Sequence, residues 1–186
     1  MRDLSLHLLD LAENAIRAEA TLVHVLVEES PSSNRLKLAI IDNGKGMSPE
    51  FLASVKSPFS TTRTTRKVGL GIPLMKATAE RSGGNLTIDS TLGKGTTIIT
   101  ELEYNHIDRP PLGRVEDTIV SLMSFHHGID IHFTYRYDAK VFEFHTEEIK
   151  AIYTDLDYYP TEVLAWVKTY LLENMEEQKS QIPNQA

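Results

Sequence analysis

Hydrophobic periodicity constrains the fold of this chain more than any other feature of its sequence. Residues 4–18 carry apolar side chains at helical spacing, which predicts an amphipathic helix. Residues 21–29 and 35–42 instead have the composition and alternation of strands, and the segment SPSSN between them is typical of a turn. The first 42 residues therefore predict a helix followed by a β-hairpin.

A long polar stretch follows the hairpin. Residues 47–68 show no sustained periodicity and are rich in Ser, Thr and basic side chains, which predicts a functional loop with at most one short helix near residues 49–55. A helix is expected over residues 71–82, because Pro73 is tolerated in a first turn and Gly83 favours a left-handed stop. Two further strands complete this part, at residues 85–91 and 95–104.

The segment NHIDRPPLG has the composition of a linker and marks a change in character. Residues 1–100 contain 12 Lys and Arg against 10 Asp and Glu, whereas residues 101–186 contain 7 against 16. Beyond the linker, the patterns predict a helix, two strands and two more helices, at residues 115–124, 129–137, 140–145, 146–153 and 160–177. We therefore expect an N-terminal domain at residues 1–104, a linker at 105–113, a small acidic α+β module at 114–178 and a frayed tail at 179–186.

Composition excludes several classes of protein. The chain has no Cys, so disulfide frameworks and thiolate metal sites are excluded. It has no run of 18 apolar residues, and its first apolar segment contains acidic side chains, so we expect no signal peptide, no membrane span and a cytoplasmic location. The acidic second part disfavours nucleic acid as a partner, because phosphate binding requires a basic surface.

The segment DNGKGM, residues 42–47, directly follows the apolar run LKLAIID. Taken alone it is typical of a turn, because Asp, Asn and Gly dominate turns. In a ligand site, Asp42 would end a strand with its carboxylate placed to accept a hydrogen bond from an amino group. Gly44 and Gly46 would let the backbone approach a flat ring closely.

Two common phosphate-binding loops do not match this sequence. A P-loop requires Ser or Thr after its Lys, but Lys94 is followed by Gly, and GLGIPL at residues 69–74 has no third Gly for a dinucleotide fingerprint. Gly69 and Gly71 nevertheless open a predicted helix, whose free amides and positive dipole end favour phosphate. Thr96, after another Gly-rich turn, adds a hydroxyl.

Asp10 and Asn14 lie four residues apart on the first predicted helix and therefore share one face. Asn14 could hold Mg²⁺ or a phosphate oxygen, and Asp10 could act as a general base on water. The alternative is an ordinary polar helix face. His7 lies on the same face, where it could assist Asp10, contact phosphate or have a structural role.

Together these segments resemble the GHKL superfamily of ATP-binding domains, shared by DNA gyrase, Hsp90, histidine kinases and mismatch-repair MutL. The resemblance covers about residues 4–104. DLAENAIRAEAT is similar to the N box, and DNGKGM, GLGI and GKGTT are similar to the first, second and third G boxes. SPFSTTRTT also resembles the segment before the second G box of histidine kinases. The resemblance implies a Bergerat-type α/β sandwich, with a mixed sheet covered by helices on one face, that binds ATP and Mg²⁺ beneath a mobile lid.

The resemblance also implies which residues would surround the adenine. Asp42 would bind the adenine amino group. Gly44, Gly46 and Met47 would line the adenine pocket, and Thr96 would lie beside it.

At the phosphate end, the resemblance implies that Asn14 coordinates Mg²⁺, and Arg17 matches a position that is basic in histidine kinases. Amides for the phosphates would come from Gly69, Leu70 and Gly71. Cations of the lid would be Arg63, Arg66 and Lys67. Each of these cations could equally be a solvated loop charge.

Two departures limit what the resemblance implies. Hydrolysing members carry Glu as the base where this chain has Asp10, which is one methylene shorter, so hydrolysis would be slow or would need a partner. A histidine kinase also requires a phosphoacceptor His on a helical hairpin before the N box. The N-box helix here starts almost at Met1, so we do not expect a complete histidine kinase.

The segment HHGIDIH, residues 126–132, raises the alternative of a metal site, with His145 opposite His132 on a paired strand. Alternation places His132 on the polar face of that strand and Ile131 and Phe133 in a core. A surface role is therefore favoured for these histidines.

Three functions stay open. The leading hypothesis is an Mg-ATP-binding regulatory protein with weak ATPase activity, in which nucleotide orders the lid and alters a partner surface. The alternatives are a protein kinase acting in trans on Ser or His, in the manner of anti-sigma factors, and a module that senses ATP without turnover.

A narrower resemblance concerns the partner, which would bind through the lid or the acidic module. The chain is similar to small stand-alone histidine-kinase-like proteins of anaerobic bacteria, some encoded beside iron-only hydrogenase subunits. That resemblance makes a redox enzyme one candidate partner, and a dimer also stays open.

Overall fold

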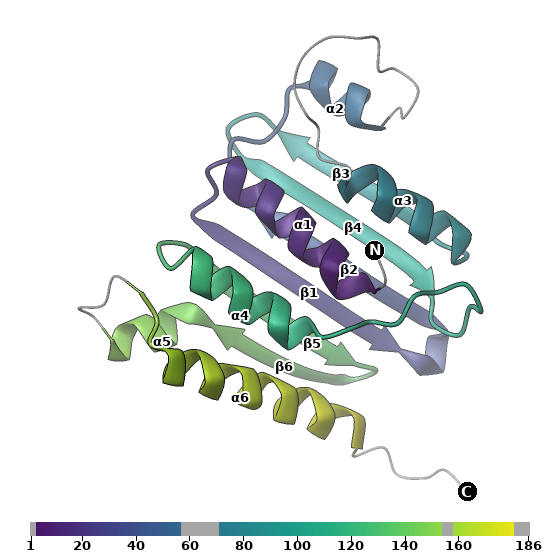
Figure 1. Cartoon of the computed structure of the whole chain (residues 1–186). Coiled ribbons are helices and arrows are strands. Elements are labelled where there is room, and N and C mark those ends of the chain that lie inside the picture. The colour runs from purple at the N-terminus through teal and green to yellow at the C-terminus, as the bar shows by residue number, and fades with distance from the viewer. Residues whose placement is uncertain (1–2, 57–70, 154–157, 181–186) are drawn as a thin grey trace, which may run out of the picture.

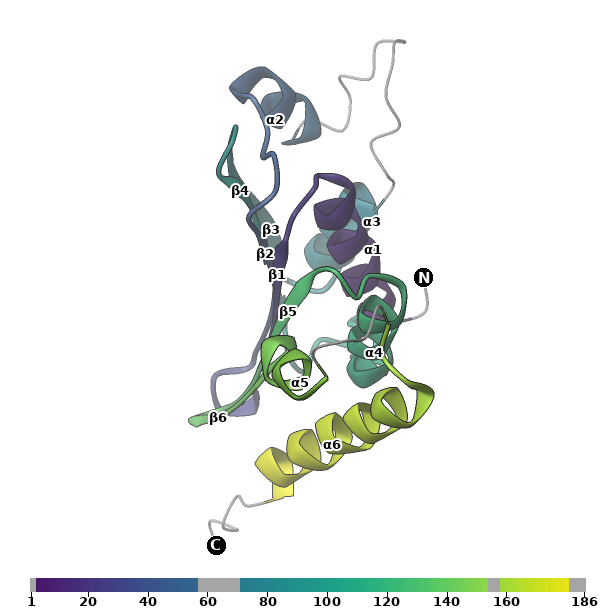
Figure 2. The same ribbon diagram turned by 90° about the vertical axis from the view of Figure 1, so that its left-hand side faces the viewer.

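The computed structural model describes residues 3–56, 71–153 and 158–180. These residues form a six-stranded mixed sheet with helices packed on one face (Figure 1, Figure 2). The helices are α1 (Leu4–Arg17), α2 (Pro49–Lys56), α3 (Gly71–Arg81), α4 (Val115–Phe125), α5 (Thr146–Ile152) and α6 (Thr161–Ser180). The strands are β1 (Leu22–Ser30), β2 (Arg35–Asp42), β3 (Asn85–Thr91), β4 (Gly95–Glu103), β5 (Asp130–Tyr137) and β6 (Lys140–His145). Every helix and strand predicted from periodicity is present, and the predicted turn after β1 is a short 3₁₀ helix, Pro31–Ser33.

The sheet has the strand order β3-β4-β2-β1-β5-β6. β1 and β5 run parallel, and the other neighbouring strands are antiparallel. The mixed sheet with helices on one face confirms the predicted α/β architecture.

The segment after the predicted linker has the expected α+β content, and its two strands extend the sheet of the first segment. β5 pairs with β1 along eight residues, from Leu22 opposite Asp130 to Glu29 opposite Tyr137. The linker itself packs on α1, because the amides of Leu4 and Ser5 donate to the carbonyl oxygens of Pro111 and Leu112 at 3.0 and 2.8 Å. The boundary near residue 105 therefore marks a change in composition and charge within one continuous sheet.

The core lies between the sheet and the layer of α1, α3, α4 and α6. Alternation along β1 buries Val23, Val25 and Val27, and alternation along β5 buries Phe133 and Tyr135. α1 lies at the centre of this layer (Figure 1), and its buried side chains are Leu4, Ser5, His7, Leu8, Leu11, Ala12 and Ala15. Since α1 contains Asp10 and Asn14, the core fixes the helix on which these predicted phosphate-end residues lie.

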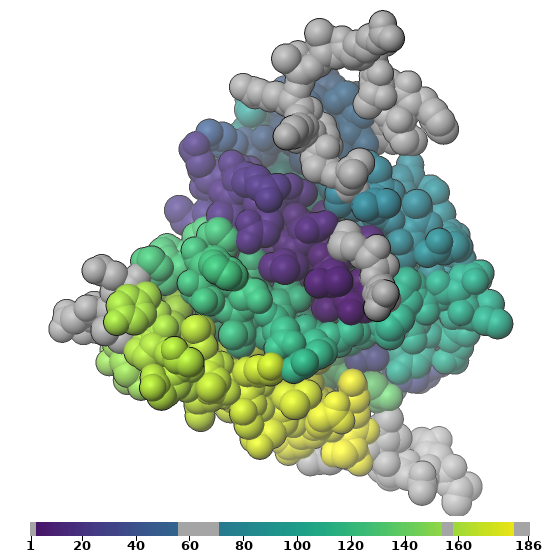
Figure 3. All heavy atoms as spheres, in the orientation of Figure 1, coloured from purple at the N-terminus to yellow at the C-terminus, as the bar shows by residue number. Residues whose placement is uncertain are grey.

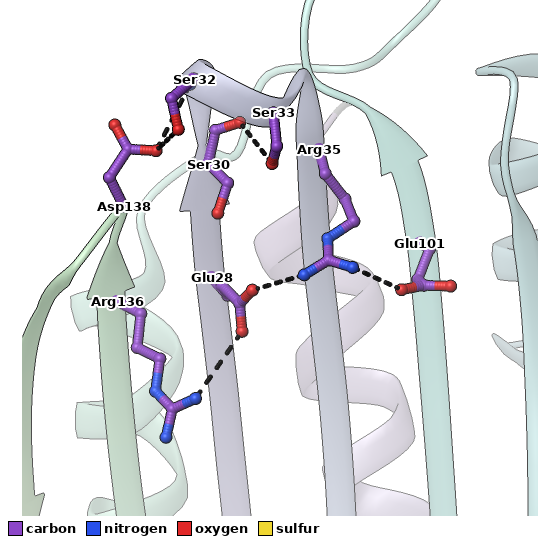
Figure 4. Close-up of polar contacts among 8 residues, drawn as sticks. All are labelled: Glu28, Ser30, Ser32, Ser33, Arg35, Glu101, Arg136 and Asp138. Atoms are coloured by element: carbon purple, nitrogen blue, oxygen red, sulfur yellow. Dashed lines mark hydrogen bonds and ion pairs between the residues drawn. The ribbon is translucent and has the colours of Figure 1, made fainter.

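No α-helix of the described residues lies on the other face of the sheet (Figure 2). Near one end of this open face, charged side chains of alternating sign cross four strands (Figure 4). Arg35 lies between Glu28 and Glu101, at 3.0 and 3.7 Å, and Arg136 lies 3.9 Å from Glu28. These pairs favour the observed register, because a shift of one residue would remove each charge from its partner's face.

Among the described residues, no helix combines the length and apolar content that a membrane crossing requires.

Candidate functional site

A pocket of about 340 Å³ opens at the end of the sheet where α1 and β2 end and β4 begins. This volume lies within the range of small-ligand sites. Its lining residues are Leu11, Asn14, Ala15, Arg17, Ala18, Asp42, Lys45, Gly46, Met47, Phe51, Val55, Ile72, Thr96 and Ile98. Six residues proposed from the sequence are therefore in one pocket: Asn14, Arg17, Asp42, Gly46, Met47 and Thr96.

Asp42 is the acidic side chain that lines this pocket. It ends β2 and pairs in register with Thr96 of β4. Burial raises the pKa of the Asp42 carboxyl, and hydrogen bonds from the backbone amides of Gly44, at 2.8 Å, and Thr96 lower it in part. A half-buried carboxylate among apolar walls suits an acceptor for a neutral donor such as an amino group.

The glycines of DNGKGM allow the loop to pack closely on its neighbours. A Cβ at Gly44 would lie 2.7 Å from the carbonyl oxygen of Ala18, so Gly44 lets the loop approach the end of α1. Gly46 has φ of 64° and would meet the carbonyl oxygen of Thr91 at 2.0 Å. Gly44 thus shapes the pocket without lining it, whereas Gly46 does both.

Sequence reasoning missed two polar residues that hold this loop. Ser90 accepts a hydrogen bond from the amide of Met47 and lies 2.9 Å from the hydroxyl of Thr96. Asn43 accepts from the amides of Thr21 and Leu22 at 2.9 Å each, which ties the loop to the start of β1. Asn43 could have been recognised as a turn residue, because it precedes Gly44 in DNGKGM, but nothing in the local sequence of β3 marks Ser90.

The apolar lining was also missed as a set. Leu11, Ala15, Ile72 and Ile98 belong to segments whose apolar pattern predicts core positions. Phe51 and Val55 lie on α2, in a stretch without sustained periodicity. These apolar side chains line the pocket only because the fold brings them together at the end of the sheet.

Asp10 and Asn14 lie together on α1, as their spacing predicts, and both adjoin the first residue of α3. A Cβ at Gly71 would lie 3.2 Å from Cβ of Asp10 and 3.8 Å from Nδ2 of Asn14. Asn14 lines the pocket and Asp10 does not, so Asp10 stands at the edge of the site. The Asn14 side-chain oxygen accepts a hydrogen bond from Nη1 of Arg17 at 3.3 Å.

These side chains fit a magnesium nucleotide at the α1–α3 end of the pocket. Carboxylate and amide oxygens are the protein ligands that Mg²⁺ prefers, and Mg²⁺ often takes only one or two of them beside substrate phosphates. Within residues 3–56, 71–153 and 158–180, no group of three or more acidic or histidine side chains is arranged to hold a metal by itself. The donor set therefore suits a metal brought in with phosphates better than a resident metal.

His7 is buried and lies outside the pocket lining. Burial lowers its pKa, and its Nδ1 has no hydrogen-bond partner among the described residues. A buried neutral imidazole favours a structural role over contact with phosphate.

Five of the proposed residues lie outside the described residues: Arg63, Arg66, Lys67, Gly69 and Leu70. Gly71, the last of the predicted amide donors, begins α3. The sequence prediction for the lid therefore stays a prediction.

The predicted pairing of His132 with His145 is confirmed. The two imidazoles stack at 4.1 Å between ring centroids, and His24 of β1 lies beside His132 in the same row. Nε2 of His132 lies 2.6 Å from Oε1 of Glu147. Among the described residues, these side chains do not form a group of three or more that could hold a metal ion.

Comparison with known proteins adds a family match. The family model described as "Histidine kinase-, DNA gyrase B-, and HSP90-like ATPase" matches residues 2–106, more than half of the chain. The chain is 34% identical over 111 residues to the "Non-motile and phage-resistance protein" of Caulobacter vibrioides, which covers 55% of this chain and 13% of that protein. It is 32% identical over 106 residues to "Sensor histidine kinase ZraS" of Escherichia coli K12, which covers 57% of this chain and 23% of that protein.

A solved structure supports the fold. The chain resembles the "Crystal Structure of N terminal domain of a DNA repair protein" with a TM-score of 0.54 and 14% identity, over 77% of this chain and 52% of that one. At this identity the likeness shows the fold alone. The sequence relatives are matched over less than a quarter of their own length.

Proposed function

The chain belongs to the family of histidine kinase-, DNA gyrase B-, and HSP90-like ATPases, and on this premise we propose that it binds Mg-ATP in the pocket at the end of α1 and uses the nucleotide to control a partner protein. The observation that carries the proposal is that Asp42 and Asn14, from different elements, line one mostly apolar pocket. Asp42 is suited to accept the adenine amino group, and Asn14 is suited to contribute an oxygen to Mg²⁺.

The remaining residues of the pocket would fix the nucleotide's orientation. Met47, Phe51 and Ile98 offer apolar surface for the adenine ring, with Gly46 and Thr96 beside Asp42. The N-terminus of α3, which starts at Gly71, favours phosphate through its free amides and its dipole. Arg17 lies at the same end and would add a positive charge.

Asp10 would act as the base for slow hydrolysis. Bound Mg²⁺ would supply charge neutralisation at the phosphates. The carboxylate of Asp10 would accept a proton from water as the water oxygen bonds to the terminal phosphorus and the bond to the ADP oxygen breaks. The short Asp side chain at the edge of the pocket supports weak rather than rapid turnover.

Isothermal titration with Mg-ATP, together with phosphate release, tests this proposal. Asp42→Asn should weaken binding at least about tenfold, because Asn has only one accepting oxygen. If that oxygen accepts from the amide of Gly44, as Asp42 does, the NH2 group faces the amino group of adenine. Asp10→Asn should bind like the wild type and lose phosphate release. Asp89→Asn, the same change on an exposed residue of β3, is the matched control and should alter neither quantity. Absence of Mg-ATP binding by the wild-type protein would overturn the proposal.

A second candidate is phosphoryl transfer to a partner instead of to water. The observation that favours it is the likeness to proteins named sensor histidine kinase and histidine protein kinase, such as DivJ of Caulobacter vibrioides, 33% identical over 98 residues. Asp10 would then orient the acceptor side chain of the partner. Labelled phosphate appearing on a partner protein, and lost with Asp10→Asn, would support this candidate over hydrolysis.

A further inference from the structure

A second groove, of about 330 Å³, is lined by residues of the end of α5 and the first turns of α6. Figure 1 shows these two helices at the opposite side of the sheet from α2 and α3. Its lining residues are Ile149, Ile152, Tyr153, Glu162, Val163 and Trp166. We call it the α5–α6 groove. None of its lining residues is shared with the nucleotide pocket.

The groove leaves large apolar side chains in contact with solvent. Ile152 is 72% exposed, Trp166 is 53% exposed and Tyr153 is 42% exposed. Trp166 belongs to α6, which lies at the surface of the molecule (Figure 3). Apolar side chains that gather in a groove, instead of being scattered, mark an interaction site.

Trp166 is held in place before any partner binds. Its ring stacks on Tyr170 with the centroids 5.0 Å apart and the planes 14° apart. Tyr170 in turn packs edge-on against Phe142 at 5.7 Å. An aromatic side chain ordered in this way loses little conformational entropy on binding, which is typical of the residues that dominate interface energies.

The charge around the groove is negative. Glu162 lines it, and Glu148 lies one turn before Ile152 on α5. Neither glutamate has an ion-pair partner in the part of the chain that the structure describes. The nearby lysines are already paired, Lys150 with Asp130 and Lys168 with Asp117.

We propose that the α5–α6 groove docks a cationic amphipathic segment of another protein, whose apolar side chain packs against Trp166 and Ile152 and whose Lys or Arg side chains pair with Glu162 and Glu148. A second copy of this chain suits the groove less well, because the formal charge of each copy is −7 and like charges would meet. A cation beside the indole ring would also gain a cation–π contact. This proposal stands whether or not the chain binds nucleotide.

The single Trp of the chain is Trp166, so its fluorescence reports directly on the groove. The probe is a short amphipathic peptide of Leu and Lys, and its control is the same pattern with Glu in place of Lys. The Leu–Lys peptide should shift Trp166 emission to shorter wavelength, and the Leu–Glu peptide should not. Glu162→Gln should weaken peptide binding about two- to fivefold, and Ile152→Ser should weaken it about tenfold.

Glu173→Gln is the matched charge control, because Glu173 is exposed on the same face of α6, about three turns beyond Glu162. It should leave peptide binding unchanged. Equal weakening by Glu162→Gln and Glu173→Gln would mean that only net charge matters and would overturn the proposal. Equal binding of the two peptides would overturn it as well. A shift of Trp166 emission with protein concentration alone would assign the groove to a second copy of this chain instead.

Discussion

The two faces of the six-stranded sheet are built from the same strands and differ in what covers them. On the covered face, α1, α3, α4 and α6 bury residues such as Val25 and Phe133, and the nucleotide pocket opens at one end of this layer. On the open face, the row of Arg136, Glu28, Arg35 and Glu101 faces solvent (Figure 4). Alternation along each strand sends one residue to the core and the next to water.

The two faces therefore contribute differently to the free energy of unfolding and to the nucleotide pocket. Burial of apolar side chains on the covered face contributes most of the stability. Partial burial at the end of this layer also raises the pKa of the Asp42 carboxyl. Arg35, Glu101 and Arg136 on the open face contribute little each, because water screens these half-exposed charges. Adjacent residues of one strand should therefore respond very differently to substitution.

The largest effect is expected from Phe133→Ala on β5. Phe133 is fully buried, so removing its ring should lower the free energy of unfolding by about 3–5 kcal/mol. The neighbouring His132→Ala, on the open face, should cost only about 1 kcal/mol, because the contacts that it loses, with Glu147 and with the ring of His145, are partly exposed. Urea denaturation measures both changes. Similar losses for the two variants would contradict the contrast between the faces.

Acidification should lower the free energy of unfolding by an intermediate amount, because a histidine on each face contributes. Burial lowers the pKa of His7 on the covered side, and burial together with His132 lowers the pKa of His24 on the open side. The folded state therefore resists protonation, whereas the unfolded imidazoles take up protons near pH 6.5. Stability should be fully present above pH 6.5 and should fall as the pH drops below it.

Variants separate the two contributions to this pH dependence. Other groups around His24 act in both directions, since Glu143 raises its pKa and His145 and Arg136 lower it. His7→Leu and His24→Gln should each reduce the decline in the urea midpoint between pH 7.5 and pH 5.5. A decline that both variants leave unchanged would show that other groups cause it.

The smallest effect is expected from Arg35→Ala in the charged row. Arg35 pairs with Glu28 and Glu101, but about half of its side chain is exposed, so the loss should stay below about 1 kcal/mol. High salt should reduce the difference between variant and wild type, because exposed pairs are screened. A larger, salt-independent loss would mean that the open face is covered by something in solution.

Much of the fold was predictable because its local signals are strong. The bounds of β2, β3 and β6 match the predicted segments 35–42, 85–91 and 140–145. Runs rich in β-branched and aromatic residues mark these strands, and glycine-rich turns lie on both sides of β3. The site was predictable where a motif is contiguous, as in DNGKGM, and also at Asp10 and Asn14, whose helical spacing places them on one face.

The parts that could not be predicted depend on contacts between distant segments. Ser90 is one polar residue in an ordinary strand, and only the fold brings it to Met47 and Thr96. Ile98 and Ile72 have the pattern of core residues and line the pocket because they lie at its end of the sheet. The α5–α6 groove likewise requires two helices to meet at a particular angle.

The sequence by itself determined the elements of this protein, their inward and outward faces and the four ordered motifs, because periodicity and turn chemistry act over neighbouring residues. Only the tertiary structure decided that β5 pairs in parallel with β1, so that the acidic segment continues the first sheet. Strand pairing across a hundred residues depends on how complete faces bury one another, and no local pattern encodes that choice.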